Sequence, residues 1–151
     1  PVPRSIGGWI GLLLVIALAA MLCATVVGWG LNLLGFHPFT VLGTIALINN
    51  LVVAVVLSPF LLALLYPRIR RARLLYRDLL GPRPQLPRWR CVVGITLVVV
   101  GTGGAFCAGE LIAGGMWLAP WATHRTPSAA FEVGVGLLPL LAVVAAGLAL
   151  L

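Results

Sequence analysis

The sequence predicts an all-α integral membrane protein, a four-helix transmembrane bundle with a basic amphipathic cytoplasmic connector. Of the 151 residues, 62% are hydrophobic and only 9% are charged, whereas about 25% of the residues of a soluble domain are charged. The chain has no lysine, and most of its arginines lie in one stretch. Basic nucleic-acid-binding proteins instead spread lysine and arginine over a polar face. These features exclude a soluble globular enzyme, a disordered tail and a nucleic-acid-binding module.

Four apolar segments are long enough to cross a bilayer and together form a single membrane domain, residues 1–151. A spanning helix needs about 20 apolar residues, because about 30 Å of hydrocarbon is crossed at 1.5 Å per residue. The segments are residues 6–34, 41–66, 91–113 and 131–151. None contains Lys, Arg or Asp, and none alternates as β-barrel strands do. Because the first residue is Pro1 rather than Met, we expect a processed chain or a fragment, and upstream helices could be missing.

The positions of the arginines predict the orientation of the chain in the plasma membrane. The loop 67–90 has a net charge of +7, which equals the formal charge of the whole chain. Its charged residues are Asp78 and Arg68, Arg70, Arg71, Arg73, Arg77, Arg83, Arg88 and Arg90. Short arginine-rich loops stay in the cytoplasm. We therefore expect this loop and both termini on the cytoplasmic side, and the turn 35–40 and the loop 114–130 on the outer side.

The second segment carries one narrow face of small and polar residues. Its members recur at spacings of three and four: Gly43, Ala46, Asn50, Ala54 and Ser58. Small residues let helices approach closely, and an asparagine amide can hydrogen-bond across helices, so we expect Asn50 to face the protein interior. Interhelical packing is its simpler role, and a ligand contact is the alternative. Pro59 predicts a kink after this face.

Small residues four positions apart predict close packing in the other three segments as well. The pairs are 101/105, 104/108 and 105/109 in the third segment, Gly7/Gly11 in the first and Ala142/Ala146 in the fourth. The cysteines Cys23, Cys91 and Cys107 have neither CxxC nor zinc-ligand spacing. We expect them to be small apolar residues of the bundle, and an approach of Cys23 to Cys107 remains open.

Most of the remaining polar side chains fall at the predicted outer helix ends and in the outer loops. They are Asn32, His37, Glu110, Trp117, Trp121, His124, Arg125 and Glu132. Such a set could line a ligand mouth, a proton path or a weak metal site, but neither HxxxH nor Glu-x-x-His occurs, and we predict no metal site. The candidate ligand-binding residues are Asn50, Glu110, Trp117, Trp121, His124 and Glu132. For Trp117 and Trp121 an interfacial aromatic belt is the alternative.

The arginine-rich loop predicts a basic amphipathic helix on the inner membrane surface. Pro67 can open this helix and Gly81 with Pro82 can close it. Between them, Ile69, Ala72 and Tyr76 follow helical spacing, which would bury one apolar side among acyl chains. The arginines are interpreted as a topology determinant and an anchor for anionic lipid. The alternative is a docking surface for a partner, and its candidate residues are Arg70, Arg71, Arg73 and Arg77.

The sequence contains none of the catalytic motifs considered. There is no phosphate-binding Gly-rich loop of Walker type, no GxSxG and no HExxH, so we expect a non-enzymatic protein without a cofactor. If the chain takes part in driven transport, a partner subunit has to supply the energy.

One stretch of the second segment and the following loop resembles a known family. It contains Ile48-Asn49-Asn50-Leu51, then Leu57-Ser58-Pro59-Phe60-Leu61-Leu62, then Leu64-Leu65-Tyr66-Pro67-Arg68 and Leu74-Leu75-Tyr76. Over residues 43–78 the chain resembles the substrate-binding subunits (S components) of bacterial energy-coupling-factor transporters. This resemblance implies a helical subunit that captures a micronutrient on its outer side and docks on a coupling subunit and two ATPases. In that family a small-xxx-small motif meets the coupling subunit, and Ala20-Met21-Leu22-Cys23-Ala24 has its form.

Two function classes therefore remain open, and a third has less support in the sequence. The first is the substrate-binding subunit of a multi-subunit micronutrient importer. Its partner subunits would contact Ala20, Ala24 and the arginines. The second is an accessory or structural subunit of a larger membrane complex, with no ligand of its own. The third is a small oligomeric channel lined by Asn50.

Overall fold

A computed structural model describes residues 5–36, 38–74, 81, 86–117, 120 and 129–151. Within these residues the chain has no strand and forms four helices: α1 at Ile6–Leu33, α2 at Phe39–Arg71, α4 at Arg88–Ala113 and α5 at Ala129–Leu150. All four are long and apolar enough to cross a membrane. The predicted all-α class and the four apolar helices are confirmed.

Three of the helices end in the same hydrogen-bonded turn, the Schellman motif. After α1, the N–H groups of Phe36 and Gly35 donate to carbonyls of the last helical turn at 3.1 and 3.0 Å, and Gly35 takes the left-handed φ of 73°. Helix α4 ends in the same way at Gly115, with φ 70°. In α2 the left-handed residue is Arg73, with φ 54°, a conformation that costs a residue with a side chain about 1–2 kcal/mol.

The prediction that a separate helix begins at Pro67 is wrong. Pro67 lies inside α2, as does Pro59, so Arg68, Arg70 and Arg71 form the last turn of α2. A proline removes one backbone hydrogen bond, and membrane helices tolerate this loss because local adjustments satisfy the freed carbonyl. The remainder of the predicted connector, residues 75–80 and 82–85, lies outside the described residues.

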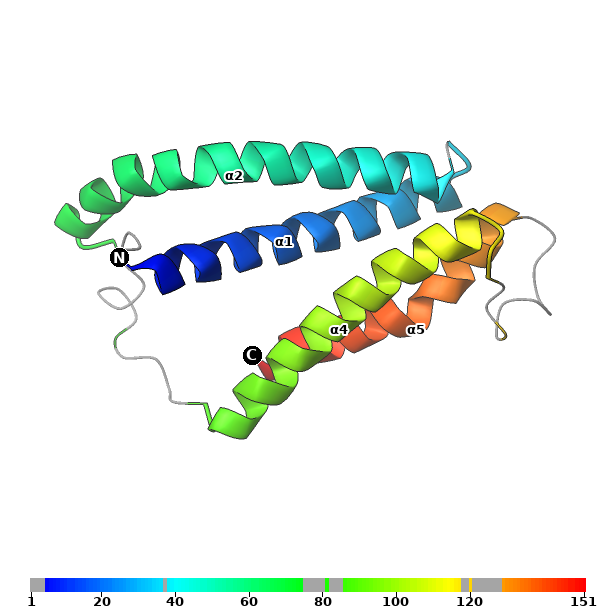
Figure 1. The fold of residues 1–151 in the computed structure, drawn as a ribbon. Helices are drawn as coiled ribbons and strands as arrows, with labels where there is room; N and C mark the ends of the chain where they lie inside the picture. Colours follow the sequence, from blue (N-terminus) through cyan, green and yellow to red (C-terminus); the bar gives the residue numbers. More distant parts are fainter. Residues whose placement is uncertain (1–4, 37, 75–80, 82–85, 118–119, 121–128) are drawn as a thin grey trace.

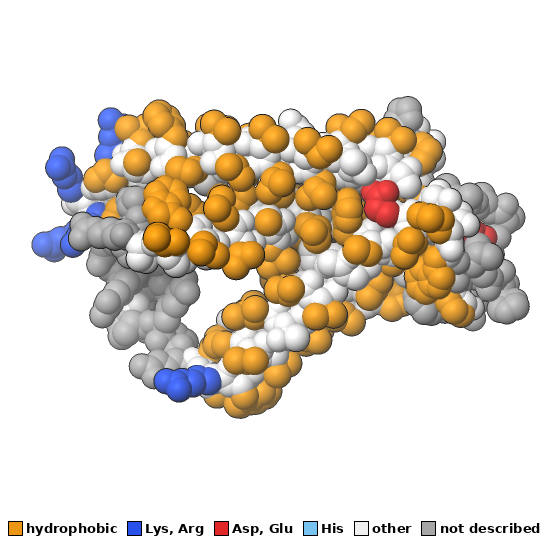
Figure 2. All heavy atoms as spheres, viewed as in Figure 1, with side chains coloured by type: hydrophobic (Ala, Val, Ile, Leu, Met, Phe, Trp, Pro, Cys, Tyr) orange, Lys and Arg blue, Asp and Glu red, His pale blue; other side chains and the backbone are white. Residues whose placement is uncertain are grey.

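The four helices form two antiparallel hairpins that meet at one end and separate at the other (Figure 1). Helix α1 packs mainly on α2, and α4 packs mainly on α5. The hairpins come together at the end where α1 and α4 finish and α2 and α5 begin, which we call the joined end. Both chain termini lie toward the opposite, open end, where Figure 2 shows the arginine side chains.

Phe39, the first residue of α2, is the centre of the joined end. Its side chain is fully buried and belongs to a cluster with residues of α4 and α5: Ala105, Ala108, Ile112, Val133 and Leu137. Three glycines surround the ring. A Cβ on Gly28 would lie 3.1 Å from Phe39 Cε2, one on Gly43 would lie 3.2 Å from Cε1, and one on Gly109 would lie 2.6 Å from Cζ. In lipid such close packing drives helix association, so the glycines make room for the ring that joins the hairpins.

Glycines also bring α4 and α5 together along their length. A Cβ on Gly147 would lie 2.9 Å from the carbonyl oxygen of Gly94, and one on Gly101 would lie 2.8 Å from Val144 Cγ2. Gly101 and Ala105 are buried, as the small pairs of the third segment predicted. The other two predicted pairs do not pack within the chain: Gly7 and Gly11 have no atom within 4 Å of an added Cβ, and Ala142 and Ala146 are exposed.

Candidate functional site

The joined end holds a carboxylate that bonds across two hairpins. Glu110 lies in the last turn of α4 and is half-buried. Its Oε1 accepts a hydrogen bond of 3.1 Å from the hydroxyl of Thr44 on α2. Gly43 lies beside this bond, since a Cβ there would be 3.4 Å from Glu110 Oε1. Among the described residues the second carboxylate oxygen has no hydrogen-bond partner, so Glu110 can still accept a bond from a ligand.

A second polar link ties the hairpins together at this end. Trp29 of α1 donates its indole N–H to the backbone carbonyl of Gly134 on α5 at 2.9 Å. A Cβ on Gly134 would lie 3.0 Å from Leu33 Cγ, which shows how closely α1 and α5 approach. Glu132, in the first turn of α5, is half-buried, and a carboxylate is favourable there because of the helix dipole. Two hydrogen bonds thus join the hairpins at this end, which also carries two carboxylates.

Asn50 does not join this group. It is half-buried and lines a groove between α1 and α2 with a volume of about 830 Å³. Because Asn50 follows Thr44 by six residues, the two side chains differ by about 120° around α2 and by about 9 Å along it. We expected Asn50 to face the protein interior, whereas the structure places its side chain on the wall of this groove and leaves Asn49 exposed. Among the described residues Asn50 makes no side-chain hydrogen bond.

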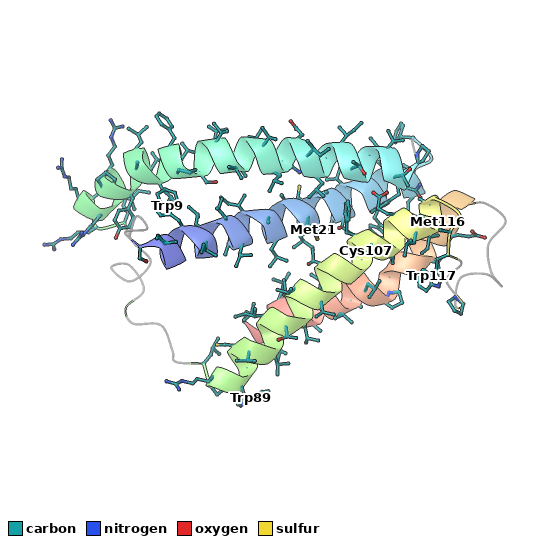
Figure 3. All side chains as sticks on the ribbon, in the orientation of Figure 1. Trp9, Met21, Trp89, Cys107, Met116 and Trp117 are labelled. Carbon is teal, nitrogen blue, oxygen red and sulfur yellow. The ribbon has the colours of Figure 1, made fainter. Side chains whose placement is uncertain are left out.

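The aromatic and imidazole members of the predicted site are placed only in part. Trp117 follows the end of α4 and is 36% exposed, and Trp121 and His124 lie outside the described residues. Figure 3 shows Trp117 and Met116 at the joined end, and Trp9 and Trp89 toward the open end. Tryptophans at both ends of a set of apolar helices are typical of an interfacial aromatic belt.

The structure separates the two parts of the predicted partner surface. Arg70, Arg71 and Arg73 are exposed at the open end, whereas Arg77 lies outside the described residues. Ala20 and Ala24 are 4% and 0% exposed, so their small side chains pack inside the chain, and only the arginines face outward.

The described residues form neither a metal site nor a disulfide. In the described part of the chain no three side chains of His, Cys, Asp or Glu come together as a metal site. All three cysteines are free, and Cys23 and Cys107 are both exposed. No disulfide joins Cys23 to Cys107 in the structure.

Two side chains that hold the joined end together were not singled out from the sequence: Thr44 and Phe39. Thr44 was missed because it is not part of the small-residue face: it follows Gly43 in the sequence and lies about 100° from it around the helix. Phe39 was missed because it precedes the predicted span, and its only signal is the set of distant glycines that pack on it. Comparison with protein-family models, curated proteins and solved structures finds no match to this chain.

Proposed function

We propose that this chain is a non-catalytic plasma-membrane subunit that captures a small substrate at its outer side for a multi-subunit importer. The observation that carries the proposal is the half-buried Glu110 with one free carboxylate oxygen, held by Thr44. Charged side chains in membrane helices are costly and usually serve a function. A free carboxylate oxygen favours a substrate with a cationic or hydrogen-bond-donating group.

The charge distribution supports the orientation in this proposal. The described arginines lie at the open end and the described glutamates lie toward the joined end (Figure 2). The positive-inside rule then assigns the open end, with both termini, to the cytoplasm, and Glu110 to the outer side. In this proposal the coupling subunit and the ATPases are separate chains, and the cytoplasmic arginines are the surface that meets them.

Thermal unfolding of the detergent-purified chain, in the presence of vitamins and metal ions, tests the proposal. A substrate present at 100 times its Kd stabilises the fold by about 2.7 kcal/mol, which gives a clear rise in Tm. Glu110→Gln should abolish the rise and Thr44→Val should weaken it. Thr96→Val is the matched control, because Thr96 is an exposed threonine on α4. A rise that persists in Glu110→Gln, or a complete screen without any rise, would contradict capture at this site.

The second candidate is an accessory subunit that packs in a larger membrane complex and binds no ligand. It is favoured by the exposed pairs Gly7/Gly11 and Ala142/Ala146, which have the form of close-packing motifs but are unused within the chain. Mass spectrometry of the complex purified under mild conditions separates the two candidates. A coupling subunit and ATPases favour the importer, and components of another complex favour the accessory role.

A further inference from the structure

The groove between α1 and α2 is apolar over most of its wall and reaches the arginine end of the chain. On α2 it is lined from Asn50 to Ile69, a length of about 28 Å at 1.5 Å per residue. Its polar lining residues are Asn50, Ser58 and Tyr66, and the others are aliphatic or Cys23. With a volume of about 830 Å³ it cannot stay empty in a bilayer, because its walls would lose their packing partners.

Arginines stand directly where this groove ends. The groove-lining residues of α2 follow helical spacing up to Tyr66 and Ile69, and Arg70 and Arg73 come four residues after each of them. Residues four apart share one helix face, and helical side chains lean toward the helix N-terminus. Arg70 therefore lies over the end of the groove. Arg73 lies just beyond the end of α2, in the turn with left-handed φ. The described glutamates lie toward the opposite end, so no described acid offsets this charge.

We propose that the α1–α2 groove holds an anionic phospholipid of the leaflet at the arginine end, with acyl chains along α2 and phosphate at Arg70 and Arg73. One leaflet is about half of the 30 Å hydrocarbon core, so an acyl chain that starts at Arg70 extends along about ten residues of α2 and ends within one helical turn of Ser58. Arginine clusters next to the cytoplasmic end of a spanning helix bind anionic lipids. The inference requires a membrane location but does not depend on substrate capture.

The test measures lipid bound to the full chain in detergent by native mass spectrometry. The chain is titrated with phosphatidylglycerol and with phosphatidylcholine of the same acyl chains. Each arginine near an anionic headgroup contributes a factor of about five to affinity, so Arg70→Gln with Arg73→Gln should weaken phosphatidylglycerol binding about 25-fold. The control pair, Arg88→Gln with Arg90→Gln, removes the same charge at the start of α4 and should leave binding unchanged.

A second pair of variants tests the groove itself. Ser58→Phe fills the groove and should displace the lipid, whereas Ala63→Phe adds the same ring at an exposed position of α2 that does not line it. If Ser58→Phe does not fold, the difference in phosphatidylglycerol binding between the two arginine pairs still tests the proposal. Equal binding of the two lipids, equal losses from both arginine pairs, or a groove covered by a second copy or a partner helix would each overturn the proposal.

Discussion

Replacing Gly109 by alanine tests whether the Phe39 ring joins the two hairpins. A Cβ at position 109 would lie 2.6 Å from Phe39 Cζ, and closer still to Cε1, so the ring or α4 has to move. Extra atoms in a well-packed core cost about 1–3 kcal/mol. Gly103→Ala on the same helix meets no atom within 4 Å and gains the same helix propensity. Gly109→Ala should therefore be about 1–3 kcal/mol less stable than Gly103→Ala.

The free energy of unfolding can be measured by titrating the purified chain in mixed micelles with SDS and following tryptophan fluorescence. Phe39→Leu, introduced together with Gly109→Ala, removes the ring atoms that the new methyl group meets. Contacting residues typically couple by 0.5–3 kcal/mol, so the double variant should be more stable than the sum of the single effects. Equal stability of the two alanine variants, or strict additivity with Phe39→Leu, would refute the role of the ring.

Three further predictions concern the helix end, the hairpin link and the orientation. Arg73→Gly should raise the free energy of unfolding by about 1 kcal/mol, because glycine adopts a left-handed φ without steric cost, and a lower SDS midpoint would contradict this. Trp29→Phe removes the 2.9 Å bond to the Gly134 carbonyl and should cost about 1 kcal/mol, while an unchanged midpoint would show that the bond contributes nothing. In a variant without the native cysteines, Met116→Cys should react with an impermeant maleimide on intact cells and Leu86→Cys only after lysis, and the reverse pattern would invert the assigned orientation.

The sequence predicted the number and positions of the helices because their signal is local. Each apolar run is longer than a bilayer-spanning helix needs, and the structure places a helix on each of them. The end of the second helix was not predicted because Pro67 gives an ambiguous local signal. A proline can start a helix, but it can also lie within a spanning helix that continues on both sides of it.

The candidate site was harder to predict because it depends on which helices pair. Glu110 was selected as one of the polar residues at the predicted outer helix ends, and the structure gives it Thr44 as a partner. No local pattern specifies that contact, since 66 residues separate the two positions. Small-residue pairs were equally ambiguous. Those around Gly101 pack on α5 while Gly7 and Gly11 have no neighbour, although both sets have the same spacing.

The two-hairpin arrangement gives the molecule the shape of a wedge. Because the hairpins touch at one end and diverge at the other (Figure 1), the four helices occupy a larger cross-section at the arginine end than at the joined end. In a bilayer, the surrounding lipid or protein would have to match this taper, since an unfilled space would forfeit dispersion contacts.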